Sequence, residues 1–111
     1  MKVSPFDIVV VPFPYSDRLA EKRRPALVIS NAALAAELGR VWVAMITSVP
    51  ATLLGDIAIE NIEAAGLPVP STIRASKIAT IDTARILRVA GSLDTADRKL
   101  ATRALLACAG Y

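Results

Sequence analysis

Short apolar runs, rich in β-branched residues and bounded by proline, glycine or charged residues, recur along most of the chain. Runs of this length and composition predict β-strands, because β-branched side chains fit a pleated sheet. The expected strands cover residues 7–13, 26–30, 41–47, 55–60, 71–82 and 86–89, the first two forming an antiparallel hairpin. In 71–82 the apolar alternation changes phase near Lys77 and Ile78, which predicts a β-bulge.

Two segments carry helix signals instead. Residues 31–38 open on the capping residue Asn31 and stop at Gly39. Residues 94–108 begin with Asp and Thr and stop at Gly110, with apolar residues at 96, 100, 104 and 107 or 108. Many short strands with few helices predict an α+β fold, a small β-barrel with helical additions. The length of 111 residues predicts one domain over 1–111.

The composition is apolar for a small globular chain, with 54% hydrophobic and 21% charged residues. Charges interrupt every apolar stretch before it reaches the roughly 18–20 residues of a membrane span, so we expect no membrane segment. The excess apolar surface predicts a homodimer. The N-terminus lacks the order of a secretion signal, and the single Cys108 cannot form an intrachain disulfide. Both features favour a cytoplasmic location.

The ionisable residues restrict the possible chemistry. The net charge of +3 and a pI near 9.4 are compatible with a polyanionic partner. The chain has no His and one Cys, which excludes a zinc site of the usual His and Cys kind and a Ser/His/Asp or Cys/His catalytic pair. Any catalysis must therefore use Arg, Lys, Asp, Glu, Ser, Thr or Tyr.

A charged segment separates the first two expected strands. It holds Asp17, Arg18, Glu21, Lys22, Arg23 and Arg24, with Tyr15 just before them. One interpretation is a solvated hairpin connection whose charges protect an edge strand from pairing with other molecules. The other is a basic loop that grips a phosphate backbone while the aromatic ring stacks on a base.

Further polar residues stand at strand ends. Arg24 directly precedes Pro25, and this proline holds the backbone of Arg24 extended. The Arg24 guanidinium therefore suits bidentate contact with phosphate, or alternatively a simple pair with Glu21. The hydroxyls of Thr47 and Ser48 could donate to a phosphate, or satisfy the turn before Pro50. A third polar cluster consists of Arg74, Ser76 and Lys77. Strand alternation would put Arg74 and Ser76 on one exposed face, which also fits a plain solvated strand.

Four segments in order, FDIVVVPFPYSD, KRRPALVIS, MITS and KIATID, resemble the MazF/PemK (Kid-like) family of toxin endoribonucleases from toxin–antitoxin pairs. The resemblance covers most of the chain. It implies an SH3-like antiparallel β-barrel with helical additions, forming a homodimer that cuts single-stranded RNA without a metal or cofactor. By this resemblance the catalytic residues are Arg24 and Thr47, with Ser48 as a neighbouring candidate.

The resemblance also implies roles for the other polar residues. Backbone or base contacts are expected from Tyr15, Arg18, Lys22, Arg23, Ser48, Arg74, Ser76 and Lys77. Family members with an acid two residues after the arginine matching Arg74 have Ser76 here, which leaves the general base unassigned. Glu21 and Asp17 are the candidates. The implied partners are RNA and an acidic antitoxin, and expression is expected to inhibit growth.

Two other functions stay open. The same barrel could bind and inhibit a protein target such as DNA gyrase without cleaving RNA, which the missing acid at Ser76 favours. An inactive family member could serve only as a decoy for an antitoxin. Retention of both Arg24 and Thr47 favours the nuclease, in which the ribose 2′-OH attacks the adjacent phosphorus.

Overall fold

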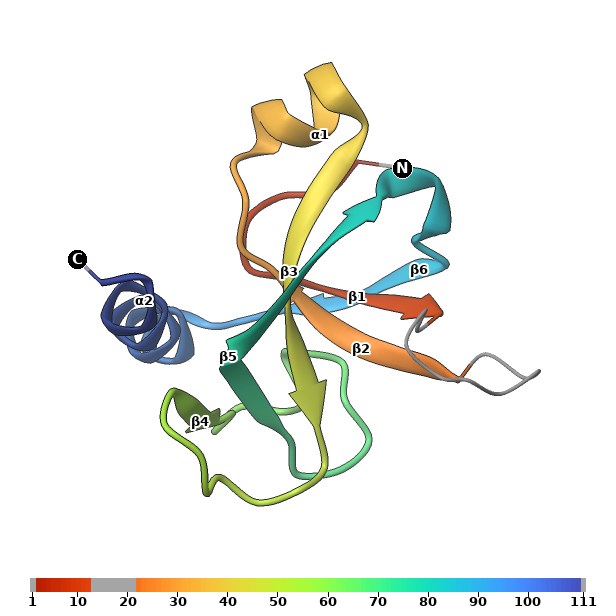
Figure 1. Cartoon of the computed structure of the whole chain (residues 1–111). Helices are drawn as coiled ribbons and strands as arrows, with labels where there is room; N and C mark the ends of the chain where they lie inside the picture. The colour runs from red at the N-terminus through yellow and green to blue at the C-terminus, as the bar shows by residue number, and fades with distance from the viewer. Residues whose placement is uncertain (1, 13–21, 111) are drawn as a thin grey trace.

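The apolar runs pair into one antiparallel sheet of six strands in the order β4-β5-β3-β2-β1-β6. The computed structural model describes residues 2–12 and 22–110 (Figure 1). Its elements are β1 (Asp7–Pro12), β2 (Arg23–Val28), α1 (Ala32–Leu38), β3 (Arg40–Thr47), β4 (Asp56–Ala58), β5 (Thr72–Asp82), the 3₁₀ turn η1 (Thr83–Arg85), β6 (Arg88–Ser92) and α2 (Thr95–Ala109). The predicted α+β class, strand-rich with a C-terminal helix, is confirmed.

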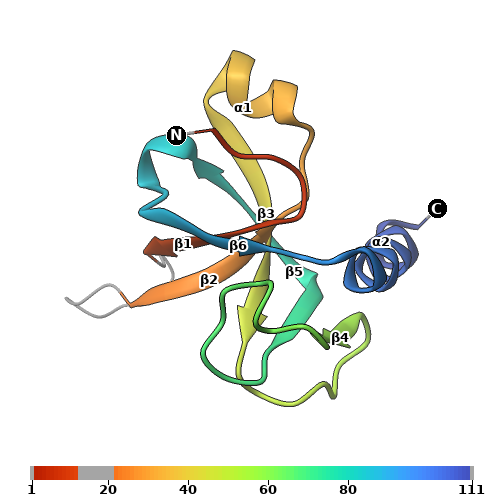
Figure 2. The ribbon, with the colours of Figure 1, turned by 180° about the vertical axis from the view of Figure 1, so that it is seen from behind.

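The sheet bends sharply, so that both of its faces are covered. In Figures 1 and 2 the β3–β5 pair crosses the β1, β2 and β6 strands at a wide angle. The expected bulge in β5 is confirmed, because Ala44 pairs with Ile78 while the next residue, Met45, pairs with Arg74. Residues 75–77 are therefore looped out of the ladder, and a strand with an insertion of this kind bends and twists more strongly.

Each face of the sheet has its own apolar cluster, as strand alternation requires. The first contains Val9, Val11, Ala26, Val28, Val41, Val43, Met45, Ala79 and Ile81, with Ala35 of α1 against it. The second contains Ile8, Leu27, Ala44, Ile46 and Ile73, together with Ile59, Ala65, Leu67, Leu93 and Ala101. Burying one Val, Leu or Ile side chain fully contributes about 1.5–3 kcal/mol. These clusters fix the strand register.

Both helices begin and end where their capping residues predict. Asn31 accepts a hydrogen bond from Ala33 N–H at 2.8 Å, and Asp94 accepts one from Asp97 N–H at 2.9 Å. Gly39 and Gly110 close the helices in the left-handed conformation. Among the described residues, no helix is long and apolar enough to cross a membrane.

The buried contacts of the C-terminal helix include a charged residue. The buried residues of α2 are Asp97 and Ala101, whereas Leu100 is 38% exposed. Asp97 is buried because its carboxylate accepts hydrogen bonds from the N–H groups of Glu60 and Asn61 at 3.1 and 3.0 Å. A stripe drawn through apolar residues alone misses such an anchor.

Three strands differ from expectation by two residues or more: β2, β6, and β4, which covers only Asp56–Ala58 of the expected 55–60. β2 begins at Arg23, because Arg23 pairs with Pro12 and extends the hairpin. β6 starts at Arg88 rather than at 86, after the η1 turn, and continues through Gly91 and Ser92, which pair with Ile8 and Asp7. Glycine and serine are poor strand formers, so this extension depends on the tertiary pairing.

Candidate functional site

The end of β3 brings a threonine beside an arginine of the neighbouring strand. Ala26 on β2 pairs with Met45 on β3, so the same antiparallel register continued by two residues sets Arg24 opposite Thr47. Side chains two residues apart on a strand lie on one face of the sheet, so both leave it on the Ala26 and Met45 side. The guanidinium and the hydroxyl thus start from adjacent strands on a common face.

Both residues line a pocket of about 260 Å³, which we call the Arg24 pocket. Its lining consists of Lys22, Arg23, Arg24, Pro25, Ile46, Thr47, Ser48, Leu67, Pro68, Val69 and Ser71. The start of β2, the end of β3 and the loop before β5 converge here. The pocket therefore gathers the basic residues at the start of β2 with the hydroxyls at the end of β3.

The Thr47 hydroxyl has a fixed local partner. Its oxygen accepts a hydrogen bond from Val49 N–H at 3.2 Å, as the turn interpretation of this residue expected. A hydroxyl that accepts one bond keeps its own O–H for donation. The Val49 contact therefore orients Thr47 as a hydrogen-bond donor at the pocket, beside the exposed Ser48.

Three cations follow one another at the rim of the pocket. Lys22, Arg23 and Arg24 are all exposed. Arg24 lies within the β1–β2 ladder opposite Val11, so its backbone is held by the sheet rather than by a loop. Adjacent like charges in a concave site raise the local positive potential and attract an anion.

Arg74 lies on β5 and contacts a carboxylate of β4. Its Nε is 3.8 Å from Asp56 Oδ1, and the side chains are 20% and 1% exposed. Burial raises the pKa of Asp56, but N–H donation from Leu53 and Thr52 and the charge of Arg74 outweigh it, so the pKa is below its ordinary value of 3.8. The expected exposed face is wrong for Arg74, because its guanidinium is turned onto Asp56.

The other two members of this cluster lie in the bulge of β5, and Arg74 itself is not among the described residues that line the Arg24 pocket. Ser76 lines a different groove, of about 640 Å³ between β5 and α2, together with Leu54 and Cys108. Lys77 is exposed on the bulge. Neither side chain is among those that line the Arg24 pocket in the described part of the chain. The predicted residues Tyr15, Asp17, Arg18 and Glu21 lie outside the described residues.

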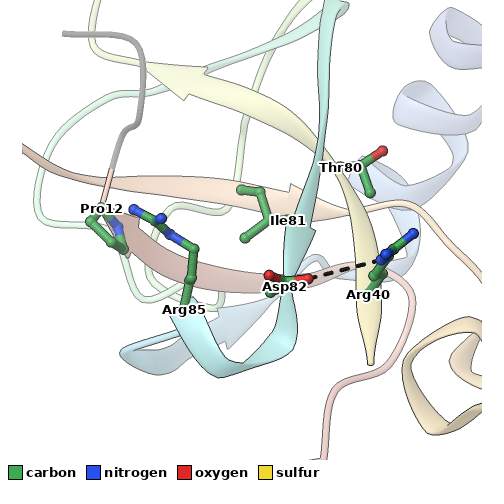
Figure 3. A pocket seen from close by; sticks show the side chains of 6 residues that line it. All are labelled: Pro12, Arg40, Thr80, Ile81, Asp82 and Arg85. Carbon is green, nitrogen blue, oxygen red and sulfur yellow. Dashed lines mark ion pairs between the residues drawn. The ribbon is translucent and has the colours of Figure 1, made fainter. Parts of the chain in front are cut away.

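Another pocket, of about 380 Å³, lies at the opposite end of β3 (Figure 3). It is lined by Pro12, Arg40, Thr80, Ile81, Asp82 and Arg85. Arg40 Nε is 3.9 Å from Asp82 Oδ1, and both side chains are exposed. Arg40 and Thr47 are the first and last residues of β3, about 23 Å apart at the usual rise per residue. This pocket is therefore separate from the Arg24 pocket.

Sequence reasoning missed one wall of the Arg24 pocket. Leu67, Pro68, Val69 and Ser71 complete its lining, and none of them was a candidate site residue. Prolines and glycine predict loop stiffness, but not the strand ends against which the loop packs. Within residues 2–12 and 22–110, no group of three or more His, Cys, Asp or Glu residues could hold a metal ion.

Comparison with known proteins finds one family. The model of the PemK-like, MazF-like toxins of type II toxin–antitoxin systems matches residues 4–108. No curated protein matches the chain.

Solved structures share the fold at low identity. An endoribonuclease in complex with its cognate antitoxin from Mycobacterial species is 18% identical with a TM-score of 0.80, covering 97% of this chain and 95% of its own. MazF from Deinococcus radiodurans is 20% identical with a TM-score of 0.79 and coverage of 100% and 99%. The Mycobacterium tuberculosis toxin MazF-mt6 is 21% identical with a TM-score of 0.77 and coverage of 94% and 96%.

Proposed function

Because the chain belongs to the PemK-like, MazF-like toxin family of type II toxin–antitoxin systems, we propose that it is a metal-independent endoribonuclease that cleaves single-stranded RNA at the Arg24 pocket. One observation carries the proposal: Arg24 and Thr47 line one pocket together with Lys22, Arg23 and Ser48. This arrangement supplies positive charge and hydroxyl donors around a site open to a phosphodiester. The expected substrate is messenger RNA in the cytoplasm.

The proposed reaction begins with the ribose 2′-OH, which attacks the adjacent phosphorus. The general base takes the proton of the 2′-OH as its oxygen bonds to phosphorus. The bond to the 5′ oxygen of the next nucleotide breaks, and that oxygen takes up a proton from water. The products are a 2′,3′-cyclic phosphate and a free 5′-OH. DNA lacks the attacking hydroxyl and is expected to resist cleavage.

The two central residues act on the charge that develops at phosphorus. The Arg24 guanidinium carries N–H donors and no acceptor, and it stabilises the phosphorane through paired N–H groups. Thr47, oriented by Val49 N–H, donates to a nonbridging oxygen. Lys22 and Arg23 hold the flanking backbone, and Ser48 gives a second hydroxyl.

The general base is proposed to come from the charged connection, where Asp17 and Glu21 are the candidates. Asp56 is the acid nearest to Arg74 in the described structure, and it is a poor acceptor because its side chain is buried and its pKa is lowered. Arg74, held by Asp56, is proposed to contact the backbone beyond the pocket, with Lys77 as a weaker contact.

The test is cleavage of a short unstructured RNA in EDTA. Wild type is expected to leave a cyclic phosphate and a 5′-OH, and Arg24→Ala and Thr47→Ala are each expected to lose about a hundredfold or more in rate while staying folded. Arg40→Ala, at the opposite end of β3, is the matched control and should cut normally. Intact RNA with excess wild type, or full activity of Arg24→Ala, would refute the proposal.

A non-catalytic inhibitor of a protein target is the second candidate. The observation that favours it is Ser76, which stands where acid-bearing family members carry a carboxylate. Stable RNA at high enzyme concentration together with specific capture of a protein target would select this function. Cleavage in EDTA that disappears in the Arg24 and Thr47 variants would exclude it.

The family implies an antitoxin partner. Its structural relatives include a complex with a cognate antitoxin, and we propose that an acidic antitoxin segment occupies the basic Arg24 pocket here. Such a segment should inhibit RNA binding competitively, and more weakly as salt increases. Growth arrest on expression of this chain, relieved by co-expressed antitoxin, tests the same proposal in cells.

A homodimer is also proposed, with β3 and α2 as the candidate interface elements. Apolar side chains remain at the surface of both, with Trp42 of β3 and Leu106 of α2 each 50% exposed. An isolated small domain rarely leaves such groups unpaired across a broad surface. Sedimentation velocity should give twice the chain mass, and Trp42→Arg should shift the species toward monomer.

A further inference from the structure

A second groove adjoins the Arg24 pocket and shares part of its lining. Val10 on β1 pairs with Pro25 on β2 and with Arg88 on β6, so these three side chains form one row across three strands. Cα atoms two strands apart are separated by about 10 Å. Together with the Leu67–Pro68 wall they line a groove of about 420 Å³, which we call the Arg88 groove. Its volume falls within the roughly 300–1,000 Å³ of small-molecule sites.

The groove and the Arg24 pocket share residues. Arg23, Pro25, Leu67 and Pro68 line both. A chain of nucleotides that enters the Arg24 pocket can therefore continue past Arg23 and Pro25 into the groove without leaving the protein surface. The two sites form one continuous track around the start of β2.

The lining of the Arg88 groove suits a nucleotide. Its floor is apolar, with Val10, Leu87 and Pro68 among the lining residues, and the exposed guanidinium groups of Arg23 and Arg88 flank it. Among the described residues that line it, none carries a carboxylate. An apolar floor or a guanidinium plane can carry the face of a base, while arginine N–H groups bind phosphate. An apolar protein segment would leave both cations without a counter-charge, so the charges favour RNA.

The wall of the groove is rigid because backbone packs directly on backbone. A Cβ at Gly66 would clash with the carbonyl oxygen of Ala90, and one at Gly91 would clash with the carbonyl oxygen of Ala64. Gly66 also has φ of +71°, which glycine adopts without strain. The loop cannot approach or leave β6 without breaking this contact, so the groove is preformed.

We propose that the Arg88 groove is an RNA subsite that binds a nucleotide adjacent to the cleaved bond, with Arg88 contacting its phosphate and Leu87 packing against its base. The subsite rests on the proposed RNA cleavage at the Arg24 pocket. It extends the recognised RNA beyond the two nucleotides that flank the scissile phosphate. Arg88 thereby sets the length of RNA that the protein prefers.

The test uses RNA built on a cleavage site that has first been mapped with the wild-type protein. Three oligonucleotides carry the scissile bond with one nucleotide on each side, with an extension on the 5′ side, or with an extension on the 3′ side. Wild type should prefer one extended RNA in kcat/KM, and Arg88→Gln should remove about tenfold of that preference. Cleavage of the minimal RNA should not change. Arg103→Gln, which removes an exposed charge from α2, is the control.

Binding of the preferred RNA with a 2′-deoxy group at the scissile position gives a second measurement. Arg88→Gln should lower the dependence of log Kd on log salt by about 0.7, the value for one lost phosphate contact on a single strand. Leu87→Ala should weaken binding without changing that dependence. If Arg88 had a purely structural role, Arg88→Gln would not change the salt dependence of log Kd while Leu87→Ala left it unchanged.

The outcomes distinguish the two proposals. If wild type cuts no RNA, the proposed function fails. If wild type cuts but prefers neither extension, or if Arg88→Gln keeps the preference or loses activity equally on the minimal RNA, the subsite alone is refuted. A change in oligomeric mass on Arg88→Gln would instead assign the groove to contact between copies of this chain, which also overturns the subsite.

Discussion

Replacement of Asp97 by alanine is predicted to destabilise the fold far more than an ordinary helix substitution. Asp97 is 1% exposed, and its carboxylate joins α2 to the segment before the 61–71 loop. Oδ1 accepts from Glu60 N–H at 3.1 Å and Oδ2 from Asn61 N–H at 3.0 Å. Removing the carboxylate therefore leaves the N–H groups of Glu60 and Asn61 without their acceptor.

The magnitude follows from these two bonds. Leaving a buried donor without its partner costs about 1–3 kcal/mol, and partial access of water to Glu60 and Asn61 favours the lower half of that range. We expect about 2–4 kcal/mol for Asp97→Ala, which corresponds to about 9–17 °C in Tm for a domain of this size. Asp97→Asn keeps the shape and one acceptor, so it should lose about half as much.

Urea and thermal unfolding at one protein concentration measure the effect, because a dimer would make Tm depend on concentration. Asp82→Ala is the matched control: its carboxylate is 68% exposed and lies 3.9 Å from Arg40, a surface pair worth less than about 1 kcal/mol. Equal losses for Asp97→Ala and Asp82→Ala would refute the assignment of Asp97 as the anchor of α2.

Three further predictions test other parts of the structure. The pKa of Asp56 is lowered in the folded state, so its ionised form stabilises the fold at pH values above the ordinary pKa of 3.8. The difference in unfolding free energy between wild type and Asp56→Asn should therefore be constant from about pH 7 to 5 and shrink as pH falls below about 4. A difference that grows toward acid pH would contradict this prediction. Gly91→Ala should cost about 1–3 kcal/mol or more in urea unfolding, because its methyl group meets the Ala64 carbonyl, and an unchanged midpoint would count against that contact. Arg98→Lys should lower the free energy of unfolding by about 1–2 kcal/mol although the charge is kept. The reason is that Arg98 donates to Leu93 O and Ser92 Oγ and lies 5.4 Å from the Phe6 ring centroid. A Lys variant as stable as wild type would show these contacts to be unimportant.

The sequence predicted the local features of the fold well, because they depend on short-range physics. Asn31, Gly39, Asp94 and Gly110 mark the helix ends through capping bonds made within a few residues. The bulge in β5 was visible as a phase change in its alternation. Such signals need no knowledge of distant parts of the chain.

The parts that the sequence could not predict depend on contacts between distant segments. Asp97 is buried only because Glu60 and Asn61 lie against it, and Arg74 turns inward only because Asp56 stands on the next strand. The same holds for the candidate site. Arg24 and Thr47 were identified by their neighbours in sequence and by family resemblance, whereas Arg88 belongs to no motif and is recognised only from the row that it forms with Val10 and Pro25.

The contact of Gly66 and Gly91 also bears on how so apolar a chain avoids self-association through its strands. A terminal strand of a sheet exposes unpaired N–H and C=O groups that can template aggregation. On β6 the Ser92 N–H already donates to Ala64 O at 3.1 Å, and the loop at 64–66 lies along that border. At the opposite border β4 has only three residues, too few for a stable foreign strand. Bulk at either glycine would expose the β6 border, so these glycines protect that edge from pairing with a foreign strand as well as stabilising the fold.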